Sequence, residues 1–225
     1  MSRLTNKIRR TRDSIVDRRW YALHQKYSDF TMMKAEDYVS NLKLVSQFAH
    51  VEGCVVECGV WRGGVSGGMA EVLGASRSYY LFDSFEGLPP AKEIDGQGAL
   101  DYQKNTESPY YFDNCKAEKD WAEKAMDRAG AKKRFIEQGW FDKTIPGYRF
   151  DSPIAILRLD GDWYASTMIC LEHLYPLVTK GGLIVIDDYY MWDGCAKAVH
   201  EYLARTSSPD RIHDAYSTGC YLIKS

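Results

Sequence analysis

The chain has 225 residues, 45% of them hydrophobic and 27% charged, which is enough apolar material for one globular domain with its own core. Its 29 lysines and arginines and 31 acids leave a net charge of −2, so we expect no nucleic-acid partner and no attraction to an anionic membrane. No apolar stretch approaches the roughly 18 residues that cross a bilayer, so we expect a soluble, cytoplasmic protein without a cleaved leader.

The first 50 residues are predicted to be mainly helical. Residues 1–19 contain seven basic residues and two aspartates, which is typical of a solvated helix; a basic arm that binds nucleic acid or membrane is the alternative. Residues 28–50 place apolar side chains near a 3.6-residue period, which predicts a further helix. We therefore treat 1–50 as an N-terminal helical region or lid and 51–225 as the main domain, within a single globular unit.

From residue 51 onward, predicted strands alternate with predicted helices. Short apolar runs predict five strands, at 53–59, 78–83, 134–139, 153–160 and 181–187. Longer periodic segments predict helices at 63–75, 117–130, 164–178 and 195–206. The last residues predict a hairpin of 211–217 and 220–225, which turns around Thr218 and Gly219.

This alternation predicts an α/β, doubly wound, Rossmann-like fold. Strands that are apolar throughout indicate a parallel sheet covered on both faces, and the closing hairpin adds antiparallel strands at one edge, for seven strands in all. Ligands of such folds bind at the carboxyl ends of the strands. Four acids follow predicted strands at these ends: Glu57, Asp83, Asp160 and Asp187.

The segment 84–117 is long, polar and aromatic, with little periodicity. A loop of this length inside a compact domain is usually functional or disordered, and its aromatic side chains argue against simple disorder. We therefore expect it to close over a substrate. The six cysteines lack the C-x2-C spacing of a zinc site, and three of them lie in predicted strands, which favours a reduced compartment.

The first strand and its turn indicate a nucleoside site. Gly59, Gly63 and Gly64 would let the backbone turn sharply, but their spacing is not that of a dinucleotide fingerprint. Glu57 would repel a pyrophosphate and suits an amino group, while Asp83 can accept hydrogen bonds from a ribose. Together these features describe S-adenosylmethionine. Taken singly, each acid has a structural alternative, Glu57 as a strand-end salt-bridge partner and Asp83 as a helix N-cap.

The acids that follow the fourth and fifth strands require a positive charge. Asp160, Asp187 and Asp188 at adjacent strand ends would repel one another, and carboxylate oxygens are the ligands that Mg²⁺ prefers. The alternative counter-ion is Arg158, two residues before Asp160 and on the same face of the strand. One guanidinium, however, is expected to pair with one or two of these carboxylates and to leave the group undercompensated.

Four segments in this order resemble the macrocin O-methyltransferase family: VECGVWRGG, LFDSFEGLP, LRLDGDWYAST and GGLIVIDDY. The similarity runs from about Tyr27 to the C-terminus and includes DGCAKAV at 193–199. The family consists of class I methyltransferases that use S-adenosylmethionine and Mg²⁺ to methylate sugar hydroxyls on macrolides and related glycosylated products. The resemblance thus implies a methyltransferase domain over 51–225, a small-molecule or glycan acceptor with a free hydroxyl, and a homo-oligomer.

The resemblance also implies roles for individual residues. In similar proteins the first acid of D-x-D and both acids of the D-D pair hold the metal, which here gives Asp160, Asp187 and Asp188. The second acid of D-x-D, Asp162, is then the general base that takes the proton of the acceptor hydroxyl. The candidate cofactor-binding residues are Glu57, Gly59, Val60, Arg62, Gly63, Asp83, Ser84, Gln138, Gly139, Trp140 and Asp160.

Two other functions remain open at this stage. A D-x-D motif is also typical of metal-dependent glycosyltransferases, although these need a diphosphate site that ECGVWRGG disfavours. A non-catalytic S-adenosylmethionine-binding module is the second alternative, but it would not need four acids at strand ends. The sequence does not identify the acceptor.

Overall fold

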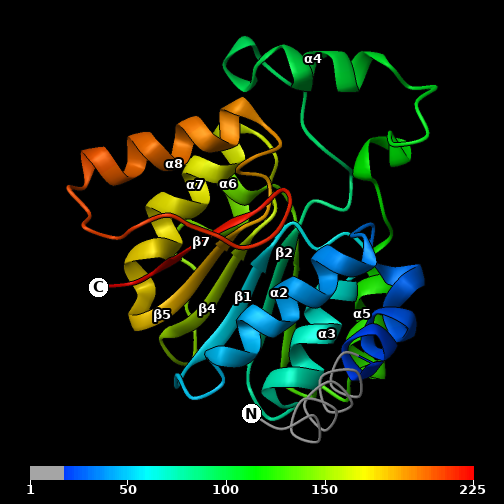
Figure 1. The fold of residues 1–225 in the computed structure, drawn as a ribbon, viewed down its shortest axis with the longest axis vertical. Coiled ribbons are helices and arrows are strands. Elements are labelled where there is room, and N and C mark those ends of the chain that lie inside the picture. Colours follow the sequence, from blue (N-terminus) through cyan, green and yellow to red (C-terminus); the bar gives the residue numbers. More distant parts are fainter. Residues whose placement is uncertain (1–17) are drawn as a thin grey trace, which may run out of the picture.

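The computed structural model describes residues 18–225 and contains one sheet with helices on both of its faces (Figure 1). Most of the basic N-terminal segment, 1–17, lies outside the described residues. The strand order is β3-β2-β1-β4-β5-β7-β6, and strands β1 to β5 are parallel, as predicted. The strands are β1 Cys54–Cys58, β2 Tyr79–Asp83, β3 Arg134–Gln138, β4 Ile154–Leu159, β5 Val178–Ile186, β6 His213–Asp214 and β7 Cys220–Ile223.

The predicted closing hairpin is confirmed. β7 runs antiparallel to β5 and pairs with the two-residue edge strand β6. The turn between them closes through hydrogen bonds from the Ala215 amide to the Gly219 carbonyl and from the Gly219 amide to the Tyr216 carbonyl. The helices, besides a helical segment at 18–27, are α2 Ala35–Gln47, α3 Gly64–Leu73, α4 Gln97–Lys104, α5 Lys119–Arg128, α6 Phe141–Thr144, α7 Tyr164–Leu174 and α8 Asp193–Arg205, with 3-10 turns η1 Ser28–Phe30, η2 Glu93–Asp95, η3 Phe112–Cys115 and η4 Tyr175–Leu177.

Two predictions about local structure were wrong. The predicted continuous helix over 28–50 is interrupted between η1 and α2, because Thr31 and Lys34 adopt extended backbone angles and the Thr31 hydroxyl accepts the amide of Met33. The segment 84–117 is not a plain loop: it contains η2, α4 and η3 and rises away from the sheet at the top of Figure 1. The short helix α6 was not predicted.

The alternation of side chains along the strands divides the core into two layers. Val55, Ile156 and Val185 face one side of the sheet, where they pack with residues of α2, α3 and α5. Val56 and Leu157 face the other side and pack with residues of α7 and α8. Because helices cover both faces of the sheet, a ligand can reach it at the carboxyl ends of the parallel strands.

The strand register places charged residues next to each other inside this apolar frame. Glu57 of β1 lies beside Arg158 of β4, and Arg158 lies beside Val185 of β5. Asp160 and Asp187 come directly after β4 and β5, two positions beyond Arg158 and Val185 and therefore on the same face. Within the described residues, no helix is long and apolar enough to cross a membrane.

Candidate active site

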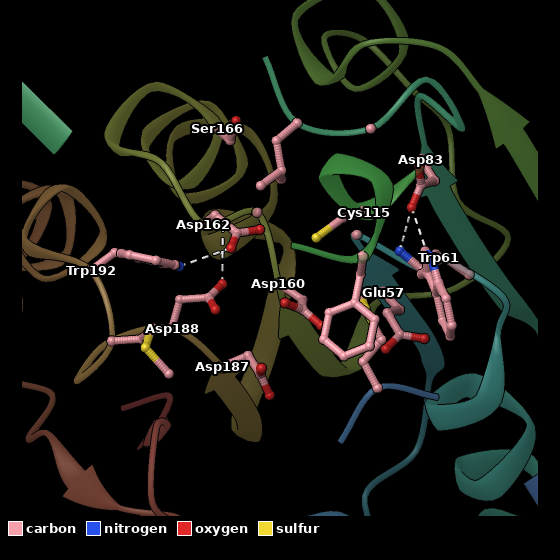
Figure 2. Close-up of a pocket in the computed structure, with 18 of the residues that line it drawn as sticks. Glu57, Trp61, Asp83, Cys115, Asp160, Asp162, Ser166, Asp187, Asp188 and Trp192 are labelled. Carbon is pink, nitrogen blue, oxygen red and sulfur yellow. Dashed lines mark hydrogen bonds between the residues drawn. The ribbon is translucent and has the colours of Figure 1, made fainter. Parts of the chain in front are cut away.

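A cavity of about 930 Å³ opens at the carboxyl ends of β1, β2, β4 and β5. Figure 2 shows the side chains of Glu57, Asp83, Asp160, Asp187 and Asp188 gathered there from different strands. The residues 30–34, the segment 84–117 and the turn before β7 line the same cavity. Its volume suits a ligand of the size of a nucleoside together with a second small molecule.

The turn after β1 brings the backbone close to the end of β4. Gly59 has a φ of +85°, and a Cβ there would lie 1.6 Å from the carbonyl oxygen of Asp160. Gly63 has a φ of +80° and begins α3. The two glycines therefore have the conformational role that the sequence predicts, because a side chain at Gly59 would collide with the main chain of β4.

Asp83 holds this turn in place. Its Oδ2 accepts the amides of Val60 at 2.7 Å and Trp61 at 2.8 Å, and its Oδ1 accepts the amide of Phe85 at 2.7 Å. Burial raises the pKa of the Asp83 carboxyl, and the three amide donors oppose that increase. A carboxylate offers about four lone-pair positions, so little acceptor capacity remains for a ligand.

We expect Asp83→Asn to lower the free energy of unfolding by about 1–3 kcal/mol, because an amide group cannot accept from three backbone amides. Urea unfolding would measure the change. Asp127→Asn is the control, since Asp127 is an exposed carboxylate paired with Arg134 and should change stability by less than about 1 kcal/mol. Equal stabilities of the two variants would contradict a clamping role for Asp83.

Arg158 lies at the centre of the charged group and is fully buried. Its guanidinium donates to Glu57 at 2.8 Å, to Asp160 at 2.8 Å and to Asp187. Burial lowers the pKa of Arg158, but the neighbouring carboxylates outweigh that effect and raise it well above its usual value, so the guanidinium stays charged. Arg158 therefore pairs with three carboxylates, more than the one or two that the sequence led us to expect.

Both oxygens of Glu57 are already occupied. Oε1 accepts from Arg158, and Oε2 accepts from the hydroxyl of Ser66 in α3. This is the salt-bridge arrangement that the sequence left open as an alternative. Glu57 lines the cavity, but its role toward a cofactor amino group stays a prediction.

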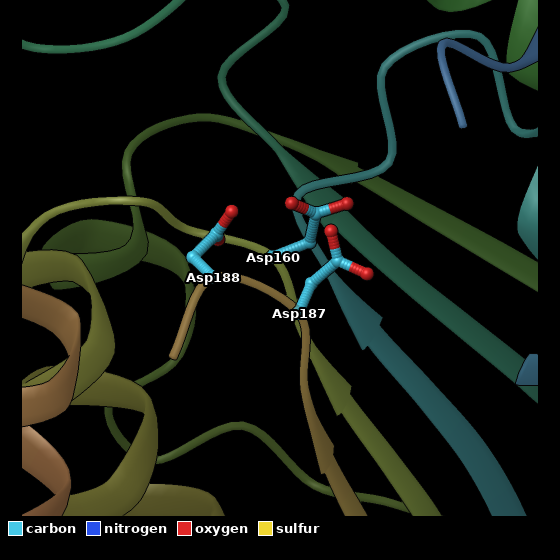
Figure 3. Close-up of side chains that lie close together, drawn as sticks. All are labelled: Asp160, Asp187 and Asp188. Atoms are coloured by element: carbon cyan, nitrogen blue, oxygen red, sulfur yellow. The ribbon is translucent and has the colours of Figure 1, made fainter. Parts of the chain in front are cut away.

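Asp160, Asp187 and Asp188 form a cluster in which one oxygen of each carboxylate lies within 4.8 Å of the others (Figure 3). One oxygen of each is occupied: Asp160 Oδ2 and Asp187 Oδ1 accept from Arg158, and Asp188 Oδ2 accepts the amide of Asp162 at 3.0 Å. The hydroxyl of Tyr216 also donates to Asp187 Oδ1, at 2.5 Å. Within residues 18–225, no hydrogen bond occupies the other oxygen of any of the three.

These remaining oxygens fit a hard divalent cation. Burial raises the pKa of Asp160 and of Asp188, and the repulsion among the neighbouring aspartates adds to the increase. A divalent cation that is bound by one oxygen of each carboxylate, with water in its remaining coordination positions, would relieve that repulsion.

Asp162 stands beside the cluster with a left-handed backbone, at a φ of +56°. Its Oδ1 accepts the indole N–H of Trp192 at 2.8 Å, as Figure 2 shows. Burial raises the pKa of Asp162 to about 7, the hydrogen bond from Trp192 opposes the increase, and the charges of Asp187 and Asp83 add to it. A carboxylate with this pKa can accept a proton near neutral pH.

The cavity brings most of the predicted site residues together but not all of them. Four predicted residues are not among its lining residues: Arg62, Gly63, Gln138 and Gly139. The guanidinium of Arg62 turns instead to the carbonyl of Asp29, at 3.2 Å, and lies over the rings of Trp61 and Trp121. Those that do line it are Glu57, Gly59, Val60, Asp83, Ser84, Trp140, Asp160, Asp162, Asp187 and Asp188.

Sequence reasoning missed three groups of lining residues. The first is the extended stretch 31–34, which the predicted helix concealed. The second is the turn residues Ser217 and Thr218, and the third is Trp192. No periodicity or motif marks these residues, because tertiary contacts alone bring them to the site. Trp163, by contrast, does not line the cavity; it is buried and donates its indole N–H to the carbonyl of Pro89, which does line it.

Comparison with known structures gives the class of the fold. The O-methyltransferase NovP superposes with a TM-score of 0.70 at 28% identity, covering 83% of this chain and 80% of that one. The O-methyltransferase from Bacillus cereus, solved in complex with S-adenosylhomocysteine, shares the fold at a TM-score of 0.55 and 11% identity, over 91% and 90% of the two chains. The sheet order, the glycine turn and the acidic strand ends therefore define a class I O-methyltransferase fold.

The chain belongs to the macrocin O-methyltransferase family, whose model matches residues 5–224. It is 37% identical over 182 residues to the 8-demethyl-8-(2,3-dimethoxy-α-L-rhamnosyl)-tetracenomycin-C 4'-O-methyltransferase of Streptomyces olivaceus, which covers 76% of this chain and 66% of that protein. It is 35% identical over 182 residues to the mycinamicin III 3''-O-methyltransferase of Micromonospora griseorubida, over 78% of this chain and 70% of that protein. The chain thus spans about two thirds of the length of these relatives.

Proposed function

We propose that the chain transfers the methyl group of S-adenosylmethionine to a hydroxyl of a sugar in a small glycosylated molecule, with Mg²⁺ held by Asp160, Asp187 and Asp188. The observation that carries the proposal is that the glycine turn and these aspartates share one cavity. Membership of the macrocin O-methyltransferase family supports the reaction, and the sugar O-methyltransferases among the relatives support the acceptor class.

We assign one side of the cavity to the cofactor and the other side to the acceptor. On one side the turn at Gly59, fixed by Asp83, lets a cofactor approach the backbone of β1. On the other side Asp162 is placed beside the aspartate cluster, where the acceptor hydroxyl would lie. The side chains thus orient the hydroxyl oxygen toward the methyl carbon, and orientation of this kind lowers the barrier substantially.

Mg²⁺ would supply a positive charge that makes the acceptor hydroxyl more acidic. Asp162 takes the hydroxyl proton on Oδ2, because Oδ1 already accepts from Trp192. The oxygen then forms a bond to the methyl carbon while the bond between that carbon and sulfur breaks, and S-adenosylhomocysteine leaves. Arg158 stays paired with Glu57, Asp160 and Asp187 throughout.

The parts of the chain around the cavity also have proposed roles. The N-terminal helical region up to residue 50 completes the cofactor side, because residues 30–34 and Asp37 line the cavity. The segment 84–117 covers the acceptor side, where Tyr102 and Cys115 line it. We further propose a homo-oligomer, which light scattering in solution would test directly.

The test of this function is methyl transfer from labelled S-adenosylmethionine to a panel of small glycosides, with and without Mg²⁺. We expect turnover on at least one glycoside, a fall of at least tenfold in EDTA, and recovery on adding Mg²⁺ back. In parallel, S-adenosylhomocysteine at 100 times its Kd should stabilise the fold by about 2.7 kcal/mol, seen as a higher melting temperature.

The two measurements separate the parts of the proposal. A melting temperature that does not respond to millimolar S-adenosylhomocysteine would refute the cofactor assignment. Full turnover in EDTA would refute the metal. Stabilisation by a nucleoside diphosphate with Mn²⁺ instead would favour a glycosyltransferase.

A further inference from the structure

Asp162 has one side-chain hydrogen-bond partner among the described residues, and that partner is Trp192. The indole N–H donates to Oδ1 at 2.8 Å, and Figure 2 shows the ring directed at the carboxylate from the far side of the cavity. Trp192 comes just before α8, thirty positions after Asp162 in the chain. Neither the family motifs nor the apolar pattern singles this residue out.

The main chain and the side chain of Asp162 are fixed by different contacts. Its amide donates to Asp188 Oδ2 at 3.0 Å, which holds the left-handed backbone in place. That contact leaves the carboxyl group free to rotate about its own bonds. The indole N–H restricts this freedom, because it engages Oδ1 and leaves Oδ2 as the oxygen without a hydrogen bond among the described residues.

The indole is itself held rigidly. Its ring packs edge to face against Trp163, at 5.2 Å between centroids, and against Tyr102 of α4, at 5.6 Å. Its backbone amide donates to the carbonyl of Asp188 at 3.0 Å. A donor fixed by its backbone and by two aromatic neighbours sets the position of an acceptor more firmly than a flexible side chain would.

We propose that Trp192 is a positioning residue, which holds the carboxylate of Asp162 so that Oδ2 faces the acceptor hydroxyl. This inference rests on the proposed function, since it assigns Trp192 a role toward the general base. Without the indole N–H, the Asp162 carboxylate would still be present but would adopt several side-chain orientations. Turnover would therefore fall while the binding of cofactor and acceptor would not.

Two variants of Trp192 separate the hydrogen bond from the packing of the ring. Trp192→Phe keeps an aromatic ring but removes the donor. Trp192→His loses the second ring but keeps a nitrogen, Nε2, at the place that the indole nitrogen occupies relative to Cβ, and that nitrogen can donate. If the hydrogen bond matters, the histidine variant is the more active; if only packing matters, the phenylalanine variant is at least as active.

We expect Trp192→Phe to lower kcat at least about tenfold with KM for the acceptor and Kd for S-adenosylhomocysteine within twofold of the parent chain. Trp192→His should recover a large part of kcat. Trp121→Phe is the control, since it removes an indole of α5 that packs against Phe30 and does not line the cavity, and its kcat should fall less than threefold. Equal losses in the two phenylalanine variants, or a histidine variant no better than phenylalanine, would overturn the proposal.

A second measurement needs no methyl transfer. In the indole ¹⁵N spectrum, the Trp192 signal is assigned as the one absent from Trp192→Phe. Asp162→Ala should move this signal and speed the exchange of its proton, while the Trp121 signal, assigned from Trp121→Phe, stays in place. An unmoved Trp192 signal would refute the contact even if the enzyme is active, whereas a moved signal in a chain that methylates no glycoside would refute the proposed function alone.

Discussion

Replacing Arg158 by methionine is expected to lower the free energy of unfolding by about 3–5 kcal/mol, the usual cost of breaking a buried ion pair by removing one partner. Glu57, Asp160 and Asp187 would lose the guanidinium that donates to all three. Urea or thermal unfolding would measure the loss. Adding Glu57→Gln to the same chain removes one of the unpaired acids and should restore part of the stability.

The pH dependence of that loss has a definite sign. Burial raises the pKa of Glu57 and Asp160 in the folded protein even with Arg158 present. The folded state therefore binds more protons than the unfolded state above the ordinary carboxyl pKa of about 4, and stability falls as the pH rises. Arg158 lowers both pKa values, so its removal raises them further, and the deficit of Arg158→Met relative to the parent chain should be larger at pH 8 than at pH 5.

Arg205→Met is the control for the Arg158 experiment. Arg205 also pairs with a carboxylate, that of Glu172 at 2.7 Å, but both groups are largely exposed to water. Exposed pairs contribute about 0–1 kcal/mol, so this variant should remain close to the parent chain. A deficit for Arg158→Met no greater than that of Arg205→Met would contradict a central role for the buried guanidinium.

Replacing Asp162 by asparagine is expected to reduce turnover by about two orders of magnitude or more, the scale of general-base assistance. The amide oxygen can still accept the indole N–H of Trp192, so the local geometry should persist. What the variant loses is the carboxylate oxygen that accepts the proton. Initial rates with labelled S-adenosylmethionine at saturating acceptor would measure the change.

Binding measurements distinguish this loss from damage to the site. Asp162→Asn should bind S-adenosylhomocysteine and Mg²⁺ with constants close to those of the parent chain, as calorimetry can show. Asp142→Asn is the control, because Asp142 also lines the cavity but is exposed and pairs with Lys143. Near-normal turnover of Asp162→Asn would remove Asp162 from the role of base.

The fold was predictable because its strands are short apolar runs and its acids follow them. The apolar segments that form β1, β2, β4 and β5 are parallel strands, so their last residues lie at the same end of the sheet for any conformation of the connecting loops. The helix α4 escaped prediction, since its sequence QGALDYQK follows one glycine, contains another at its second position and has few apolar residues to set a period. The interruption before α2 escaped for the opposite reason, because the apolar period continues across it.

The acids of the candidate site could be predicted from the sequence, but their ion-pair and hydrogen-bond partners could not. Asp160, Asp187 and Asp188 do form a cluster, as strand ends on neighbouring parallel strands must. The pairing of Arg158 with Glu57 depends on the register between β1 and β4, which no single strand encodes. Trp192 reaches Asp162 across thirty residues of intervening chain, and only the packed structure brings the two together.

The contacts of the turn before β7 bear on how the protein is made. Tyr216 donates to Asp187, and the Ser217 hydroxyl donates to Asp37 at 2.6 Å across 180 positions of sequence. During translation the chain up to β5 can pair its parallel strands before the turn exists, and the cavity then lacks the part of its wall that Ser217 and Thr218 form. A chain that has been made only as far as β5 therefore already carries Asp160 and Asp187, but not the Tyr216 hydroxyl that donates to Asp187.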